Sequence, residues 1–135
     1  MEIGTLIIII AAAVVFLVLI SLVNKVTPRG IDRPYFKNEW NDILKTAQDS
    51  KTSQMSIIQA DKLLDEALKC CGYRGETMGE RLVSAKHALK SRDSVWAAHK
   101  LRNKLVHESL AEPSHKEIQR ALRGYAKAFN DLRVF

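Results

Sequence analysis

The chain has 135 residues, of which 47% are hydrophobic and 27% charged, and these ordinary values argue against a disordered or low-complexity protein. Its length accommodates one membrane segment and one small domain, but not a second domain. The formal net charge is +6, and the two cysteines, Cys70 and Cys71, are adjacent in sequence, which is incompatible with a disulfide framework.

An apolar run without a charged residue extends from Ile3 to Val23. A helix of about 20 residues spans the roughly 30 Å hydrocarbon core of a bilayer. The alternative is a cleavable signal peptide, which would have a positive n-region, a shorter apolar run and a small-residue cleavage site. Only Glu2 is charged ahead of the run, and Asn24 and Lys25 follow it. We therefore predict a retained transmembrane anchor over residues 1–24.

The flanks of this anchor predict its orientation. Basic residues stay on the cytoplasmic side of a membrane, and here they all follow the apolar run. We therefore expect a single-pass protein of the cell membrane, with the N-terminus outside and the C-terminal domain in the cytoplasm. Residues 25–35 are predicted to form a basic juxtamembrane linker that contacts membrane lipid headgroups. The basic flank consists of Lys25, Arg29, Arg33 and Lys37.

From residue 36 to 135 the apolar residues recur at intervals of three and four, which indicates helices. Four to five helices joined by short loops bury such stripes most readily as an antiparallel bundle, so we predict an all-α domain. The expected helices lie around 40–47, 57–71, 82–89, 95–110 and 118–132.

Several of these helix ends carry capping signals. Gly72 occupies a position where helices commonly end. The residues 77–80 and 114–117 have the form of capping boxes, and Asp93 or Ser94 can cap the fourth helix.

The fourth helix carries the polar residues of chemical interest. His99, Asn103 and His107 are four positions apart and share one face, with Arg102 beside them. Arg102 and His107 lie about 140° apart around the helix axis. Because an Arg side chain is long, both could still reach one phosphate from the flanks of a groove that Asn103 lines.

This arrangement, Arg102-Asn103 followed by His107, resembles the signature of the HEPN superfamily. Those are small all-helical domains, many of them metal-independent RNases of toxin–antitoxin, phage-defence and CRISPR systems. The resemblance covers about Phe36 to Phe135 and leaves out the apolar N-terminal run. Toxin members paired with a nucleotidyltransferase antitoxin commonly have a Tyr two residues after the His, where this chain has Ser109.

The resemblance implies a homodimer in which two motif-bearing helices line one cleft, with RNA as the substrate. Cleavage by the RNA 2′-OH needs a group that titrates near neutral pH and a fixed cation, but no metal. His107 would be the general acid or base, Arg102 would hold the phosphate, and Asn103 would orient one of them or bond the backbone. Accessory residues on the same helix are His99, Lys104 and Glu108.

Two classes of function stay open on the sequence alone. The segment from Arg74 to His107 has eight Lys and Arg against three acidic residues, a net charge of +5 that would suit a polyanion. Basic helix surfaces are common, however, and His107 at a helix C-terminus is also suited to the helix dipole. The alternative is therefore a non-catalytic membrane-anchored adaptor that binds a protein, a nucleotide or RNA. Neither the adjacent cysteines nor the scattered histidines have the spacing of metal ligands, so no metal or cofactor is expected.

Overall fold

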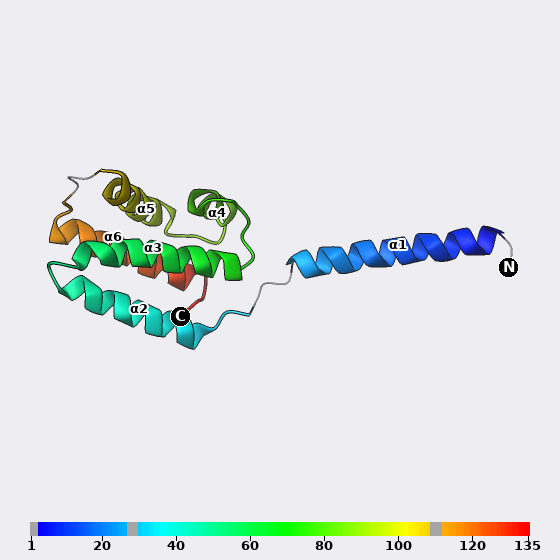
Figure 1. Ribbon diagram of the computed structural model, residues 1–135, viewed down its shortest axis with the longest axis horizontal. Helices are drawn as coiled ribbons and strands as arrows, with labels where there is room; N and C mark the ends of the chain where they lie inside the picture. The colour runs from blue at the N-terminus through cyan, green and yellow to red at the C-terminus, as the bar shows by residue number, and fades with distance from the viewer. Residues whose placement is uncertain (1–2, 27–29, 109–111) are drawn as a thin grey trace.

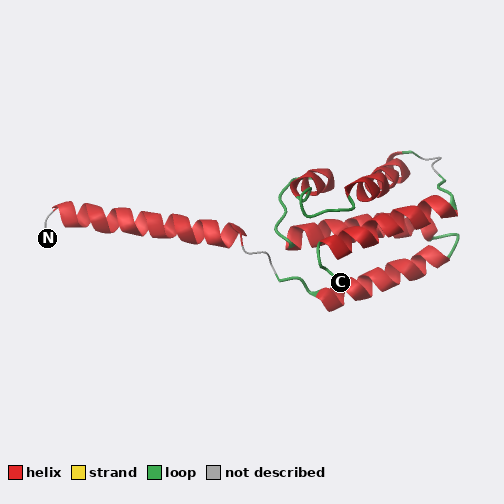
Figure 2. Cartoon of the chain, turned by 180° about the vertical axis from the view of Figure 1, so that it is seen from behind, coloured by secondary structure: helices red, strands yellow, loops and turns green. Residues whose placement is uncertain are grey.

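The chain forms six α-helices in the computed structural model, which describes residues 3–26, 30–108 and 112–135. These residues contain no strand, which confirms the all-α prediction (Figure 2). The first helix, α1, spans Ile3–Val26 and stands apart from the other five, which pack together as a bundle (Figure 1).

The helix α1 has the length and composition of a membrane-spanning helix. Its residues Ile3–Ser21 are continuously apolar, and none of them is buried against the rest of the protein. A helix of 24 residues is about 36 Å long, enough to cross a hydrocarbon core of roughly 30 Å. A signal sequence near the N-terminus would have the same properties.

The second helix, α2, spans Arg33–Gln48 and so begins inside the predicted linker over 25–35. Pro34 lies in its first turn, where the missing N–H of proline leaves no hydrogen bond unmade. Asp32 caps the helix by accepting a hydrogen bond from the Tyr35 backbone N–H at 3.0 Å. Residues 27–29 of the predicted linker lie outside the described residues.

The predicted stop at Gly72 and the first capping box are confirmed. The helix α3 spans Ser53–Cys70, and its C-cap residue Cys71 is followed by Gly72, whose φ of +84° glycine adopts without strain. The helix α4 spans Met78–Ser84, and Thr77 and Glu80 cap its N-terminus reciprocally. It is shorter than the predicted helix over 82–89, because residues 85–90 form turns that still bury Leu89.

The helix α5 spans Arg92–His107, and α6 spans His115–Asp131. Neither Asp93 nor Ser94 caps α5, because its N-cap residue is Ser91, which donates from its backbone N–H and its hydroxyl to the Asp131 carboxylate at 2.9 and 2.7 Å. The second capping box, over 114–117, is present as predicted. The end of the predicted helix at Leu110, like Ser109, lies outside the described residues.

The core of the bundle lies around α3, which packs against α2, α4, α5 and α6, while α5 also packs against α6. The rings of Trp40 and Phe129, with centroids 5.4 Å apart, join α2 to α6. At Gly124 the helices α5 and α6 approach so closely that an added Cβ would lie 2.6 Å from the Ser94 carbonyl oxygen. The four long helices of the bundle therefore enclose one core, and α4 lies beside α3.

A polar cleft between α3, α4 and α5

A buried carboxylate, that of Asp61 on α3, lies at the inner end of the site. Only 3% of Asp61 is exposed, and its Oδ1 lies 2.8 Å from His99 Nδ1 of α5 and 3.0 Å from the Tyr125 hydroxyl of α6, which donates to it. Arg102 Nε lies 3.5 Å from Asp61 Oδ2, close enough for an ion pair. Burying an unpaired carboxylate costs several kcal/mol, so these three partners are what makes the burial of Asp61 tolerable.

The Tyr125 hydroxyl serves this network as a permanent donor. Burial, and then the neighbouring Asp61 carboxylate, raise the pKa of Tyr125 above its usual range. The hydroxyl therefore keeps its proton at all physiological pH values, and the hydrogen bond to Asp61 persists.

A chain of hydrogen bonds connects Asp61 to the predicted motif. A neutral His99 ring that donates through Nδ1 to Asp61 can accept at Nε2 from the side-chain amide of Asn103, 3.3 Å away. Asn103 Oδ1 in turn accepts a hydrogen bond of 3.0 Å from Arg102 Nη1. Arg102 is thus held from two sides, by Asp61 through Nε and by Asn103 through Nη1.

These side chains border a cleft of about 540 Å³ between α3, α4 and α5. Arg102 keeps 32% of its side chain exposed there, while its Nε is buried and makes no hydrogen bond. The lining residues are Ile58, Asp61, Lys62, Asp65, Glu76, Thr77, Met78, Gly79, Arg81, His99, Arg102 and Asn103.

A second ion pair fixes the wall of the cleft. Arg81 of α4 donates to both carboxylate oxygens of Asp65 on α3, at 2.5 and 3.1 Å, and also to the Gly75 carbonyl. Lys69 lies 2.8 Å from the same carboxylate. Burial alone would raise the pKa of Asp65, but the hydrogen bonds and charges of Arg81 and Lys69 outweigh it and lower that pKa. The short helix α4 is therefore held on α3 by charge as well as by apolar contact.

The formal charges that line the cleft balance. Lys62, Arg81 and Arg102 face the carboxylates of Asp61, Asp65 and Glu76. Arg81 is fully engaged with Asp65, so Lys62 and the outer edge of Arg102 are the cations best placed to meet a ligand. Such a cleft suits one compact anionic group better than a long polyanion.

The structure brings together only part of the predicted site. Arg102, Asn103 and the accessory His99 line the cleft. His107, the last residue of α5, is exposed and does not line it, which follows from its angular separation from Arg102 on the helix. The accessory Glu108 is an exposed C-cap residue, and Lys104 faces a groove between α5 and α6. Arg102 and Lys104 therefore face two different sides of α5.

Several residues of the site were not among the predicted ones, among them Asp61, Lys62, Asp65, Arg81 and Tyr125. Asp61 does leave a signal in the sequence, because it follows the apolar stripe residues Ile57 and Ala60 at helical spacing and so falls on the buried face of its helix. Its partners come from two other helices, α5 and α6, and no sequence spacing identifies them.

Among the described residues, no three His, Cys, Asp or Glu side chains are arranged so that they could hold a metal ion. Cys70 and Cys71 are free thiols and partly buried, and burial together with the neighbouring Cys70 raises the pKa of Cys71. This lowers the thiolate fraction of Cys71 at neutral pH, and with it the reactivity.

No protein-family model, curated protein or solved structure matches this chain.

The network around Asp61 predicts a large effect of its removal. Asp61→Ala leaves the Arg102 guanidinium and the Tyr125 hydroxyl without their buried partner, and should lower the free energy of unfolding by about 3–5 kcal/mol. Tyr125→Phe removes one hydrogen bond and should cost about 1 kcal/mol. Urea unfolding followed by tryptophan fluorescence measures both.

Asp42→Ala is the matched control, because Asp42 forms an ion pair with Lys45 in which both side chains are more than half exposed. Its loss should change stability by no more than about 1 kcal/mol. Equal effects of Asp61→Ala and Asp42→Ala would contradict the structural role of Asp61.

Proposed function

We propose that this protein is a membrane-anchored, HEPN-like helical adaptor that binds the phosphate group of a nucleotide or of RNA in the cleft between α3, α4 and α5. The observation that carries the proposal is the setting of Arg102. Its guanidinium is held by Asp61 and Asn103, yet one third of the side chain faces the cleft. A positioned guanidinium offers a planar set of N–H donors, which matches the oxygens of a phosphate better than a flexible ammonium does.

The surroundings of Arg102 favour binding over catalysis. The nearest imidazole, that of His99, has Asp61 on one ring nitrogen and Asn103 on the other, so neither nitrogen is free to exchange a proton with a ligand. The exposed imidazole of His107 lies outside the cleft. Lys62 at the cleft rim supplies a second cation for the same anionic group.

The helix α1 supports an anchored location for this domain. We propose that α1 stays in the cell membrane as a single pass, with the N-terminus outside and the bundle in the cytoplasm, because Lys25, Arg29, Arg33 and Lys37 follow the apolar run. The same basic flank would contact anionic lipid headgroups. The adaptor would thus present its cleft at the cytoplasmic face of the membrane.

Binding can be tested with the full chain in detergent micelles, titrated with adenosine 5′-monophosphate and with a short single-stranded RNA. Arg102→Ala removes charge-assisted hydrogen bonds and should weaken binding by about tenfold to a hundredfold. Lys104→Ala is the matched control, since it removes a cation from another side of the same helix. Binding of both probes points to a single phosphate as the ligand, and binding of the RNA alone points to the polymer.

A chain that binds neither probe, or that binds both equally well with Arg102→Ala, would rule out the cleft as a phosphate site. The free energy of unfolding of Arg102→Ala is measured alongside, because this variant also removes the partner of Asp61.

A metal-independent endoribonuclease is the second candidate function. It is favoured by the solvent access of both motif residues, since His107 is exposed and Arg102 partly so. Because the two point about 140° apart on one helix, a shared phosphate would have to lie between Arg102 of one protomer and His107 of another. This requires the homodimer through the motif-bearing helix.

The nuclease proposal predicts that the full chain cleaves mixed RNAs in the presence of EDTA. His107→Ala should abolish this cleavage, because it removes the proton-transfer group, whereas His87→Ala, an exposed histidine of the turns over 85–90, should leave it intact. RNA fragments resolved on a denaturing gel provide the measurement. If a chain verified to be dimeric does not cleave RNA, the nuclease proposal fails and the non-catalytic adaptor is the function that remains.

The proposed topology predicts that a tag at the C-terminus is protected from protease added to intact cells. The positive residues that follow α1 hold that side of the helix in the cytoplasm, so the tag should be digested only after the cells are permeabilised. Immunoblotting of the tag is the readout. Digestion in intact cells would show that the C-terminal domain lies outside the cell, opposite to the proposed orientation. A tag found in the medium on a shortened chain would identify α1 as a signal peptide.

A further inference from the structure

Two further grooves lie on different sides of the bundle, one between α2 and α3 and the other between α5 and α6. The helices α3 and α6 pack against each other, with α2 against α3 and α5 against both. The two grooves share no lining residue, so they are separate surfaces. The polar cleft described above belongs to a third side, between α3 and α5.

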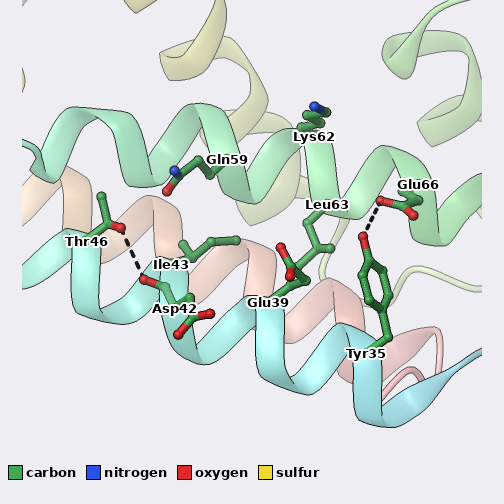
Figure 3. A pocket seen from close by; sticks show the side chains of 9 residues that line it. All are labelled: Tyr35, Glu39, Asp42, Ile43, Thr46, Gln59, Lys62, Leu63 and Glu66. Atoms are coloured by element: carbon green, nitrogen blue, oxygen red, sulfur yellow. Dashed lines mark hydrogen bonds between the residues drawn. The ribbon is translucent and has the colours of Figure 1, made fainter.

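The groove between α2 and α3 is acidic and has a volume of about 340 Å³ (Figure 3). Three carboxylates line it, from Glu39 and Asp42 on α2 and Glu66 on α3, against one cation, Lys62. The Tyr35 hydroxyl donates to Glu66 at 3.2 Å and closes one end. The apolar residues Ile43 and Leu63 contribute to the same groove.

The groove between α5 and α6 has the opposite charge and nearly the same volume, about 360 Å³. Three cations line it, Lys100, Lys104 and Arg120, against the single carboxylate of Glu117. Hydrogen bonds from the Ser114 backbone and hydroxyl, helped by Lys104 and Arg120, lower the pKa of Glu117, so it stays ionised. The α5–α6 groove is also lined by the apolar side chains of Ala97, Ala98, Leu101 and Ala121.

We propose that these two grooves are the two halves of one self-association contact, in which the α2–α3 groove of one copy packs against the α5–α6 groove of the next. Three carboxylates and one cation line the first groove, and three cations and one carboxylate line the second. Because Asp42 already pairs with Lys45 at 2.8 Å, Glu39 and Glu66 are the carboxylates that complement the cations of the next copy. Ile43 and Leu63 are buried beneath the first groove, and Ala98 and Ala121 beneath the second, so the contact depends on charge rather than on apolar area. The occupant is thus a second copy of this chain, and the proposal does not depend on what binds in the polar cleft.

The contact is heterologous, because it joins two different surfaces. Each copy keeps one unused groove after pairing, so association continues into a closed ring or an open row. Anchoring through α1 would confine the copies to a membrane and raise their effective concentration, so that a contact too weak to form in dilute solution is populated there. Screening by salt should weaken it, because Glu39, Lys100 and Lys104 are exposed and Glu66 is only partly buried.

The test measures energy transfer between donor- and acceptor-labelled full chains in phosphatidylcholine vesicles at low ionic strength. Two charge-reversal variants are needed. Glu39→Lys with Glu66→Lys makes both grooves basic, and Lys100→Glu with Lys104→Glu makes both grooves acidic. Each variant alone should associate about tenfold more weakly than the natural chain, because like charges then meet. An equimolar mixture of the two should recover association, and so should a chain that carries all four substitutions.

The control is Lys51→Glu with Lys86→Glu, which matches the net-charge change of Lys100→Glu with Lys104→Glu at exposed positions that line neither groove. It should associate like the natural chain, and circular dichroism verifies that every variant is folded. Loss of energy transfer at high salt in the natural chain is also expected.

Three results would overturn the head-to-tail contact. Association that survives in the variant with reversed Glu39 and Glu66 but is lost in the variant with reversed Lys100 and Lys104 indicates a symmetric contact or a different partner at α5 and α6. Association that appears only when RNA is added assigns the basic groove to nucleic acid. Energy transfer no greater than that of randomly distributed copies excludes self-association. None of these readouts uses Arg102, so the proposed phosphate site stands or fails separately.

Discussion

The buried carboxylate of Asp61 is the constraint on which the site depends. Its desolvation would cost several kcal/mol if it were unpaired, and the chain offsets that cost with partners from α5 and α6. His99 and Arg102 tie α5 to α3, and Tyr125 ties α6 to it. The same pairing turns Arg102 inward along α3, so the guanidinium of the predicted motif serves the packing of the bundle and borders the cleft at once.

Helix periodicity explains why α5 contributes to two different surfaces. Arg102 and His99 lie on the side that meets α3, whereas Lys100 and Lys104 lie on the exposed side toward α6. The basic excess of this segment is therefore concentrated away from the cleft. A stretch of sequence with a net charge of +5 thus contributes, once helical, to a balanced cleft on one side and a cationic groove on another.

Local signals in the sequence predict much of the fold. The capping boxes at 77–80 and 114–117 and the stop at Gly72 depend on contacts within a few residues, and all three are present. The start of α5 depends instead on Asp131, which is forty positions away from Ser91 and cannot be found by local pattern. The candidate site shares this difficulty, because the position of Arg102 depends on Asp61, and that of Arg81 depends on Asp65, both on another helix.

The charge on α5 also bears on which assembly the chain can form. A symmetric dimer through the exposed side of α5 would set Lys100 and Lys104 of two copies against each other, and such like-charge contacts cost several kcal/mol. A polyanion lying between the two helices would remove that repulsion, so the symmetric dimer that a nuclease needs should depend on RNA. Without a polyanion, the same lysines are best neutralised by the carboxylates of Glu39 and Glu66 on a neighbouring copy. The ligand would therefore select between two arrangements of the same anchored chains.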